Sequence, residues 1–148
     1  MPRSSKSFLF PDVNVWLALT YERHVHHSAV GRWFQRLDPE SQLCFCRFTQ
    51  ISLLRLLNTS AVMGSEVMNQ TDAWNAYDQW IDSGVAVLLD EPTGLERSFR
   101  AFSQQTKPAP KDWADSYLAA FASVSGVRLV TFDRSFAGRH QDVIILRS

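Results

Sequence analysis

Short apolar runs recur along the chain, several of them bounded by Gly, Pro or Asp. Runs of this length between turn-forming residues are typical of strands buried in a sheet. The predicted strands cover residues 8–10, 43–45, 85–89, 127–131 and 143–146.

The stretches between these runs carry apolar residues every three or four positions, which is the period of an amphipathic helix. One such stripe comprises Ala29, Val30, Trp33, Phe34 and Leu37. Thr49 is the expected N-cap of a helix that ends near Asn58, and Gly84 and Gly126 are expected at the ends of two later helices. The predicted helices cover residues 13–21, 26–37, 49–58, 73–81, 93–105 and 111–125, and residues 59–71 are predicted to form an irregular connection.

Alternating strands and helices predict an α/β fold with a mainly parallel central sheet that helices cover on both faces. The sequence has 148 residues and shows no internal repeat and no shift in composition. We therefore expect one domain over residues 1–148, because this length is close to the usual size of a single domain. The 45% hydrophobic and 20% charged content argues against long disordered stretches.

Charge and cysteine content narrow the class of protein only slightly. Fifteen basic residues balance fifteen acidic ones, which excludes no partner, because a nucleic-acid enzyme needs only a local basic face. Cys44 and Cys46 are two apart and lack a second pair, so we interpret them as apolar residues of a buried strand. The apolar N-terminal run is interrupted at Pro11 and is too short for a membrane span, so we expect a cytoplasmic protein without membrane association.

Acidic residues follow two of the predicted strands directly. Asp12 comes after the first strand, and Asp133 comes after the strand over residues 127–131. In parallel sheets the ligand site lies beyond the carboxyl ends of the strands. Asp115, on the helix between them in the chain, falls where this fold brings it to the same edge. Three carboxylates gathered from separate elements provide the hard oxygen ligands that divalent metal ions need for phosphodiester hydrolysis.

The residues alone leave a second interpretation of each acid open. Asp12 suits a turn or the N-cap of the following helix, and Asp133 suits a turn after its strand. Asp112 and Asp115 lie three apart at a helix start, which is a capping arrangement that also suits the helix dipole. For Asp112 we keep the capping interpretation. The metal-site interpretation depends on the three other acids taken jointly.

Four segments occur in the order seen in PIN-domain proteins, and together they span residues 8–136. They are FPDVNVWLAL, FTQISLLRLLN, WADSYLAAFA and GVRLVTFDRSF. The chain resembles most closely the VapC-type toxins of type II toxin–antitoxin systems. The resemblance implies a PIN-like three-layer α/β/α sandwich and an endoribonuclease that requires Mg²⁺ or Mn²⁺. It also implies a homodimer that a cognate VapB-type antitoxin silences, with contacts expected near residues 28–37 and 49–81.

The resemblance also implies roles for single residues. Asp12, Asp115 and Asp133 match the acids that hold metal in the family, with Asp133 acting directly or through water. Asn14 matches a polar residue that orients the ligands, and Thr131 would support Asp133 from the same strand end.

One position departs from the family pattern. Many PIN domains carry a glutamate about where Ser52 stands, whereas this chain has Gln50 and no acid in that turn. Gln50 offers a neutral oxygen, so the site would carry less negative charge and could hold one metal ion or two.

Some further residues have two interpretations. His24, His26 and His27 suit solvated or capping roles at a helix start, with RNA contact as the alternative. The candidates for contacts with the RNA backbone are Lys107, Lys111, Arg134 and Arg139.

Two function classes follow. The first is a VapC-like toxin that hydrolyses RNA with a metal-activated water. The second is a catalytically silent PIN-like module that binds RNA or protein, for which the missing glutamate is the support. A flavodoxin-like or response-regulator domain is weaker, since the expected acids and lysine are absent.

Overall fold

The computed structural model describes residues 7–140 and 142–147 of the chain. Its strands are β1 (Ser7–Pro11), β2 (Ser41–Phe45), β3 (Ala86–Leu88), β4 (Arg128–Thr131) and β5 (Val143–Ile145). They form one sheet in the order β3-β2-β1-β4-β5, and every neighbouring pair is parallel. The predicted parallel sheet is confirmed, and β1 lies at its centre.

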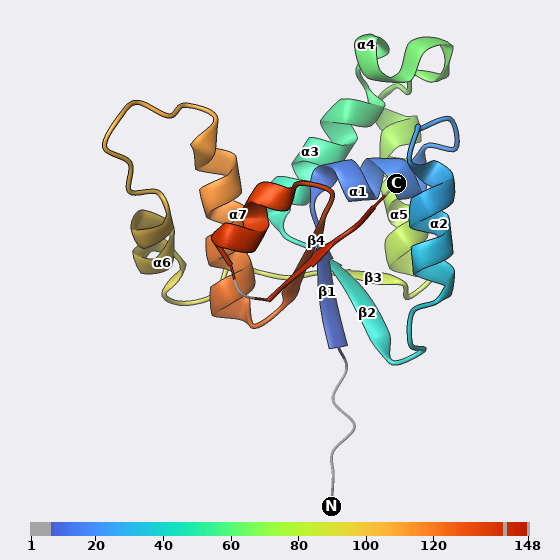
Figure 1. Ribbon diagram of the computed structural model, residues 1–148. Coiled ribbons are helices and arrows are strands. Elements are labelled where there is room, and N and C mark those ends of the chain that lie inside the picture. The colour runs from blue at the N-terminus through green and yellow to red at the C-terminus, as the bar shows by residue number, and fades with distance from the viewer. Residues whose placement is uncertain (1–6, 141, 148) are drawn as a thin grey trace, which may run out of the picture.

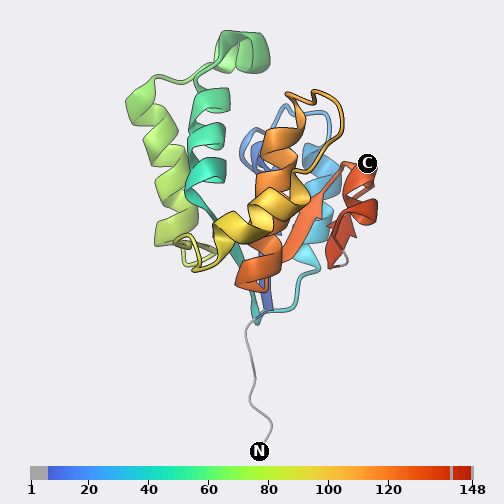
Figure 2. The same cartoon turned by 90° about the vertical axis from the view of Figure 1, so that its left-hand side faces the viewer.

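Helices cover both faces of this sheet (Figures 1 and 2). The face that packs α1, α2, α3 and α5 has its own apolar cluster, and the face that packs α6 and α7 has a second one. The helices are α1 (Val13–Thr20), α2 (His27–Gln35), α3 (Arg47–Leu57), α4 (Ser60–Met63), α5 (Gln70–Asp82), α6 (Leu95–Phe102) and α7 (Asp112–Ser125), with 3-10 turns η1 (Gly64–Glu66) and η2 (Arg134–Gly138). The three-layer α/β/α sandwich is therefore confirmed.

The alternation of side chains along each strand divides the core between the two faces. Leu9 packs toward α1 and α3, whereas the neighbouring Phe10 packs on α7, where its ring lies 5.0 Å from that of Phe121. Cys44 and Cys46 are both buried in the cluster on the α7 side, as the spacing of two predicts. Both thiols are therefore part of the apolar packing.

Two segments differ from the sequence-based expectation. The helix α3 begins at Arg47 rather than after Thr49, because the Cys46 N–H donates to Thr49 Oγ1 at 3.0 Å and the chain turns two residues earlier. Residues 59–71 are not irregular, since they contain α4, η1 and the first residues of α5. The Met68 N–H donates to the Leu57 carbonyl at 2.9 Å and folds this segment back on the end of α3.

The pairing of β1 with β4 determines where the candidate site lies. The Asp12 N–H continues this ladder by donating to the Val130 carbonyl at 2.9 Å. The carboxyl ends of the two strands therefore meet at one edge, above which α7 begins. Within the described residues, no helix combines the length and the apolar character that crossing a membrane requires.

Candidate active site

Asp12 is buried at the point where β1 ends and α1 begins. Its Oδ1 accepts from the Val15 N–H at 3.1 Å, so Asp12 is the N-cap of α1. Capping was one of the two roles that the sequence left open for this residue. Capping occupies one lone pair of a carboxylate that has about four. The Thr131 hydroxyl and the Asn14 N–H also donate to this carboxylate, which leaves about one lone pair for a further ligand.

Thr131 connects Asp12 to Asp133 at the same edge of the sheet. The fully buried Thr131 hydroxyl donates to Asp12 Oδ2, and its oxygen accepts from the Asp133 N–H at 3.0 Å. From the sequence we expected Thr131 to support Asp133 alone. The structure shows that it also contacts the other acid directly.

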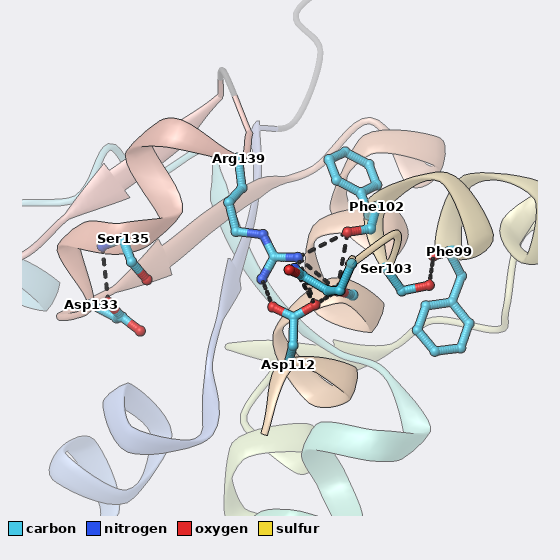
Figure 3. Close-up of polar contacts among 9 residues, drawn as sticks. Phe99, Phe102, Ser103, Asp112, Asp133, Ser135 and Arg139 are labelled. Carbon is cyan, nitrogen blue, oxygen red and sulfur yellow. Dashed lines mark hydrogen bonds and ion pairs between the residues drawn. The ribbon is translucent and has the colours of Figure 1, made fainter. Parts of the chain in front are cut away.

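Asp133 is exposed and stands at the start of η2. Its Oδ1 accepts from the Ser135 N–H at 2.9 Å (Figure 3), so the turn interpretation describes a real contact. The other carboxylate oxygen of Asp133 points away from η2.

Asp115 lies in the first turn of α7 and is half-buried. Burial raises its pKa, and the nearby charge of Asp133 raises it further, whereas Arg139 lowers it. Burial also raises the pKa of Asp12 to about 6, although the hydrogen bond from Thr131 lowers it, and the charge of Asp115 adds to the rise. Asp115 thus interacts electrostatically with both of the other acids. We call Asp12, Asp115 and Asp133, with Thr131, the acidic edge.

The acidic edge is chemically suited to a divalent cation. Burial raises the pKa of both Asp12 and Asp115, and the charge of a neighbouring carboxylate raises each of them further, so a bound cation would offset the cost of their negative charge. Mg²⁺ keeps several waters and needs only one or two carboxylates from a protein. Among the described residues no three His, Cys, Asp or Glu side chains are gathered closely enough to hold an ion by themselves. Asp12 and Asp115 therefore fit as a partial ligand set that water and substrate would complete.

Asn14 and Gln50 differ in their access to the site. Asn14 is exposed on the first turn of α1, and its backbone N–H hydrogen-bonds to the Asp12 carboxylate. Gln50 is buried, and its Oε1 accepts from Arg47 Nη1 at 2.6 Å. The Ser52 hydroxyl instead donates to the Phe48 carbonyl at 2.7 Å on the outer side of α3. Of these two α3 side chains, Gln50 rather than Ser52 thus points into the protein.

A cavity of about 510 Å³ opens beside Asp115, and its wall includes Pro110 and Lys111. The same two residues also line a larger apolar groove of about 780 Å³, to which Phe48 and Trp113 contribute exposed rings. A single-stranded nucleic acid that reached Asp115 would therefore pass a lysine and two aromatic side chains, which are groups that contact phosphates and bases.

His24, His26 and His27 each contact other parts of the protein near the start of α2. His27 Nδ1 lies 2.7 Å from the Ala18 carbonyl, and the His26 N–H donates to His24 Nδ1 at 3.0 Å. The His26 ring packs 4.5 Å from that of Phe132, the residue before Asp133. These contacts agree with a structural role at the start of α2.

Asp112 and Arg139 form an ion pair that the sequence analysis did not predict. Arg139 Nη1 donates to Asp112 Oδ1 at 2.6 Å and Nη2 to Oδ2 at 3.3 Å (Figure 3). Nη2 also donates to Ser116 Oγ at 2.6 Å and to the Phe102 carbonyl at 3.0 Å. Asp112 lies in the first turn of α7, as expected, but its carboxylate accepts from these side chains and from Gln105, and Lys111 is the N-cap residue. Pairing across 27 residues leaves no local sequence signal.

Comparison with known proteins shows the family of this fold. The family model of the PIN domain matches residues 9–139. Ribonuclease VapC41 of Mycobacterium tuberculosis is 46% identical over 132 residues, covering 86% of this chain and 90% of that protein. The crystal structure of Mycobacterium tuberculosis VapC20, a sarcin–ricin loop cleaving toxin, matches with a TM-score of 0.65 at 17% identity, covering 88% of this chain and 93% of that one. VapBC2 from Rickettsia felis, solved with a promoter DNA fragment, matches with a TM-score of 0.65 at 11% identity, covering 93% and 96%.

Proposed function

This chain belongs to the PIN domain family, and from that premise we propose that it is a VapC-type endoribonuclease, the toxin of a type II toxin–antitoxin pair, that requires Mg²⁺ or Mn²⁺. The observation that carries the proposal is the acidic edge, where Asp12 and Asp115 are both buried enough to raise their pKa values. The 46% identity to ribonuclease VapC41 supports the same reaction class. In this proposal residues 1–148 act as one domain.

In the proposed reaction, Asp12 and Asp115 hold the metal ion and Asp133 completes the acidic site. The chemistry that Mg²⁺ supplies when bound is to make a water molecule more acidic and to offset the charge that develops on the phosphodiester. Thr131 holds the Asp12 carboxylate in place through its hydroxyl. Asn14 fixes the same carboxylate through its backbone N–H. Many PIN domains have an acid about where Ser52 stands, and in that turn of α3 this chain offers only the neutral oxygen of the buried Gln50, which also accepts from Arg47.

The proposed substrate is RNA, which would lie across the cavity beside Asp115. Lys111 lines both this cavity and the apolar groove, so it can pair with a backbone phosphate while a base contacts Trp113. The proposed partners are a second copy of this chain and a VapB-type antitoxin. The Rickettsia felis VapBC structure supports the antitoxin, since it is a toxin–antitoxin complex of the same fold.

We expect Asp12→Asn and Asp115→Asn each to abolish RNA cleavage while the protein stays folded, because both remove a charged metal ligand without changing side-chain volume. The measurement is mapping of cut sites on total RNA in Mg²⁺, with circular dichroism as the check on folding. The control is Asp78→Asn, which changes an exposed carboxylate on α5.

Two results would contradict the proposal. One is full cleavage by either variant, and the other is cleavage by the unmodified protein that persists in excess EDTA. A calorimetric titration with Mn²⁺ distinguishes the nuclease from a silent PIN-like binding module, because such a module has no need for metal affinity at Asp12 and Asp115.

A further inference from the structure

The ion pair of Arg139 with Asp112 ties together the two segments that carry Asp115 and Asp133. Asp112 and Ser116, which both contact the Arg139 guanidinium, lie on either side of Asp115 along the start of α7. Arg139 itself stands at the end of η2, where its N–H donates to the Phe136 carbonyl at 3.0 Å. Asp133 caps the other end of the same turn. The ion pair therefore connects the start of α7, which carries Asp115, to η2, which begins after Asp133.

The guanidinium is held by a closed set of contacts that leaves it little freedom. It meets both carboxylate oxygens of Asp112, and the Ser116 hydroxyl, which accepts from Arg139, donates to Asp112 Oδ2 at 2.8 Å. The Phe102 carbonyl at the end of α6 is a further acceptor. Paired contacts of this kind need the planar fork of arginine, which lysine cannot reproduce.

A second arginine–aspartate pair provides a comparison within the same molecule. Arg128 Nε lies 2.7 Å from Asp142 Oδ1, yet these side chains are 47% and 56% exposed. The side chains of Arg139 and Asp112 are 20% and 18% exposed. Arg128 begins β4, at the end of the strand opposite the acidic edge. The two pairs share their chemistry and differ in burial and in distance from the site.

We propose that Arg139 is a positioning residue, whose ion pair with Asp112 holds Asp115 and Asp133 at the spacing that binds the metal ion. This inference rests on the proposed function, because it concerns the metal site of the acidic edge. It takes Arg139 out of the set of RNA-binding candidates, since both of its terminal nitrogens, Nη1 and Nη2, already donate within the protein.

A positioning role and a purely electrostatic effect of Arg139 predict opposite changes in cation affinity when this residue is replaced. The positive charge of Arg139 lies close enough to lower the pKa of Asp115. If charge were its only effect on the site, removing it would strengthen cation binding, because a repelling charge would be gone. If Arg139 positions the acids, removing it weakens cation binding, and Arg139→Lys weakens it as well because the charge remains while the paired contacts are lost.

The experiment is isothermal calorimetry of Mn²⁺ binding to the full chain, for the unmodified protein and for Arg139→Gln, Arg139→Lys, Arg128→Gln and Asp115→Asn. We expect Kd for Mn²⁺ to rise roughly tenfold or more in both Arg139 variants, which is the usual effect of removing a residue that orients metal ligands. Arg128→Gln removes the same charge and should leave Kd unchanged. Thermal melts give the folded fraction, and should Arg139→Gln not fold, Arg139→Lys and Asp112→Asn carry the test.

Each outcome has a distinct meaning. Tighter binding in Arg139→Gln with unchanged binding in Arg139→Lys would show a charge effect and overturn the positioning role. A lower melting temperature with an unchanged Kd would show a purely structural ion pair and overturn it too. Mn²⁺ binding that survives in Asp115→Asn, or is absent from the unmodified protein, would overturn the proposed metal site and this inference together.

Discussion

At the scale of single residues, the burial of Asp12 has a measurable consequence for stability. Burial raises its pKa from the ordinary value of 3.8 to about 6. Between these two values the folded protein holds a proton that the unfolded chain has released. The free energy of unfolding of the metal-free protein therefore decreases as pH rises through this interval, and the stability contributed below it is lost above pH 6.

We expect Asp12→Asn to lack this decrease. Its stability advantage over the unmodified protein should grow from near zero at pH 4 to as much as about 3 kcal/mol at pH 7, from 1.36 kcal/mol per pKa unit. The measurement is urea unfolding in EDTA at both pH values. An advantage that is equal at pH 4 and pH 7 would mean that the pKa of Asp12 is not raised. Other carboxylates titrate in both proteins, so the comparison isolates Asp12.

At the scale of elements, replacing a glycine at the end of a helix and replacing one inside a helix should change the stability of the protein in opposite directions. Gly126 ends α7 with φ of 68°, which is the left-handed region that disfavours other residues. Gly31 lies inside α2, and a Cβ there would meet no atom within 4 Å.

We therefore expect Gly126→Ala to lower the free energy of unfolding by about 1 kcal/mol or more, and Gly31→Ala to raise it by about 0.5–1 kcal/mol. Urea unfolding of both variants provides the measurement, and each serves as the control for the other. Changes of the same sign would contradict the assignment of these two backbone environments.

The elements also show how far the sequence could predict the structure. The strands and the long helices could be predicted because the spacing of the apolar residues agrees with the residues that mark the ends of these elements, as it does at Gly126 and after Pro11. The structure of residues 59–71 could not be predicted, because it depends on contacts with α3 and on the burial of Met63 rather than on a periodic pattern within the segment. The placement of Asp12, Asp115 and Asp133 on one edge followed from strand ends and motifs. The ion pair of Arg139 did not, because it depends on where η2 docks.

At the scale of the whole molecule, an exposed apolar face bears on the proposed homodimer. Ile51 on α3 is 54% exposed and Trp74 on α5 is 45% exposed. Both line a groove of about 350 Å³ between these helices. Large apolar side chains gathered on one surface are typical of protein–protein contacts.

We expect Ile51→Lys to convert the proposed dimer to a monomer, because it would place a charge within the proposed contact. Sedimentation velocity gives the mass in solution. The control is Val25→Lys, which changes a side chain that is 85% exposed in the connection between α1 and α2 and should leave the mass unchanged. A monomeric unmodified protein would contradict the homodimer, and a dimeric Ile51→Lys variant would place the contact elsewhere.

The hydrogen bond between Thr131 and Asp12 joins residues that lie 119 positions apart. A chain synthesised from its N-terminus places β1 and the first acid outside the ribosome long before β4 exists. Until β4 pairs with β1, the nascent chain has neither the hydroxyl that holds Asp12 nor the turn that carries Asp133. Under the proposed function, the growing polypeptide therefore has no complete acidic edge until β4 has been synthesised and has paired with β1.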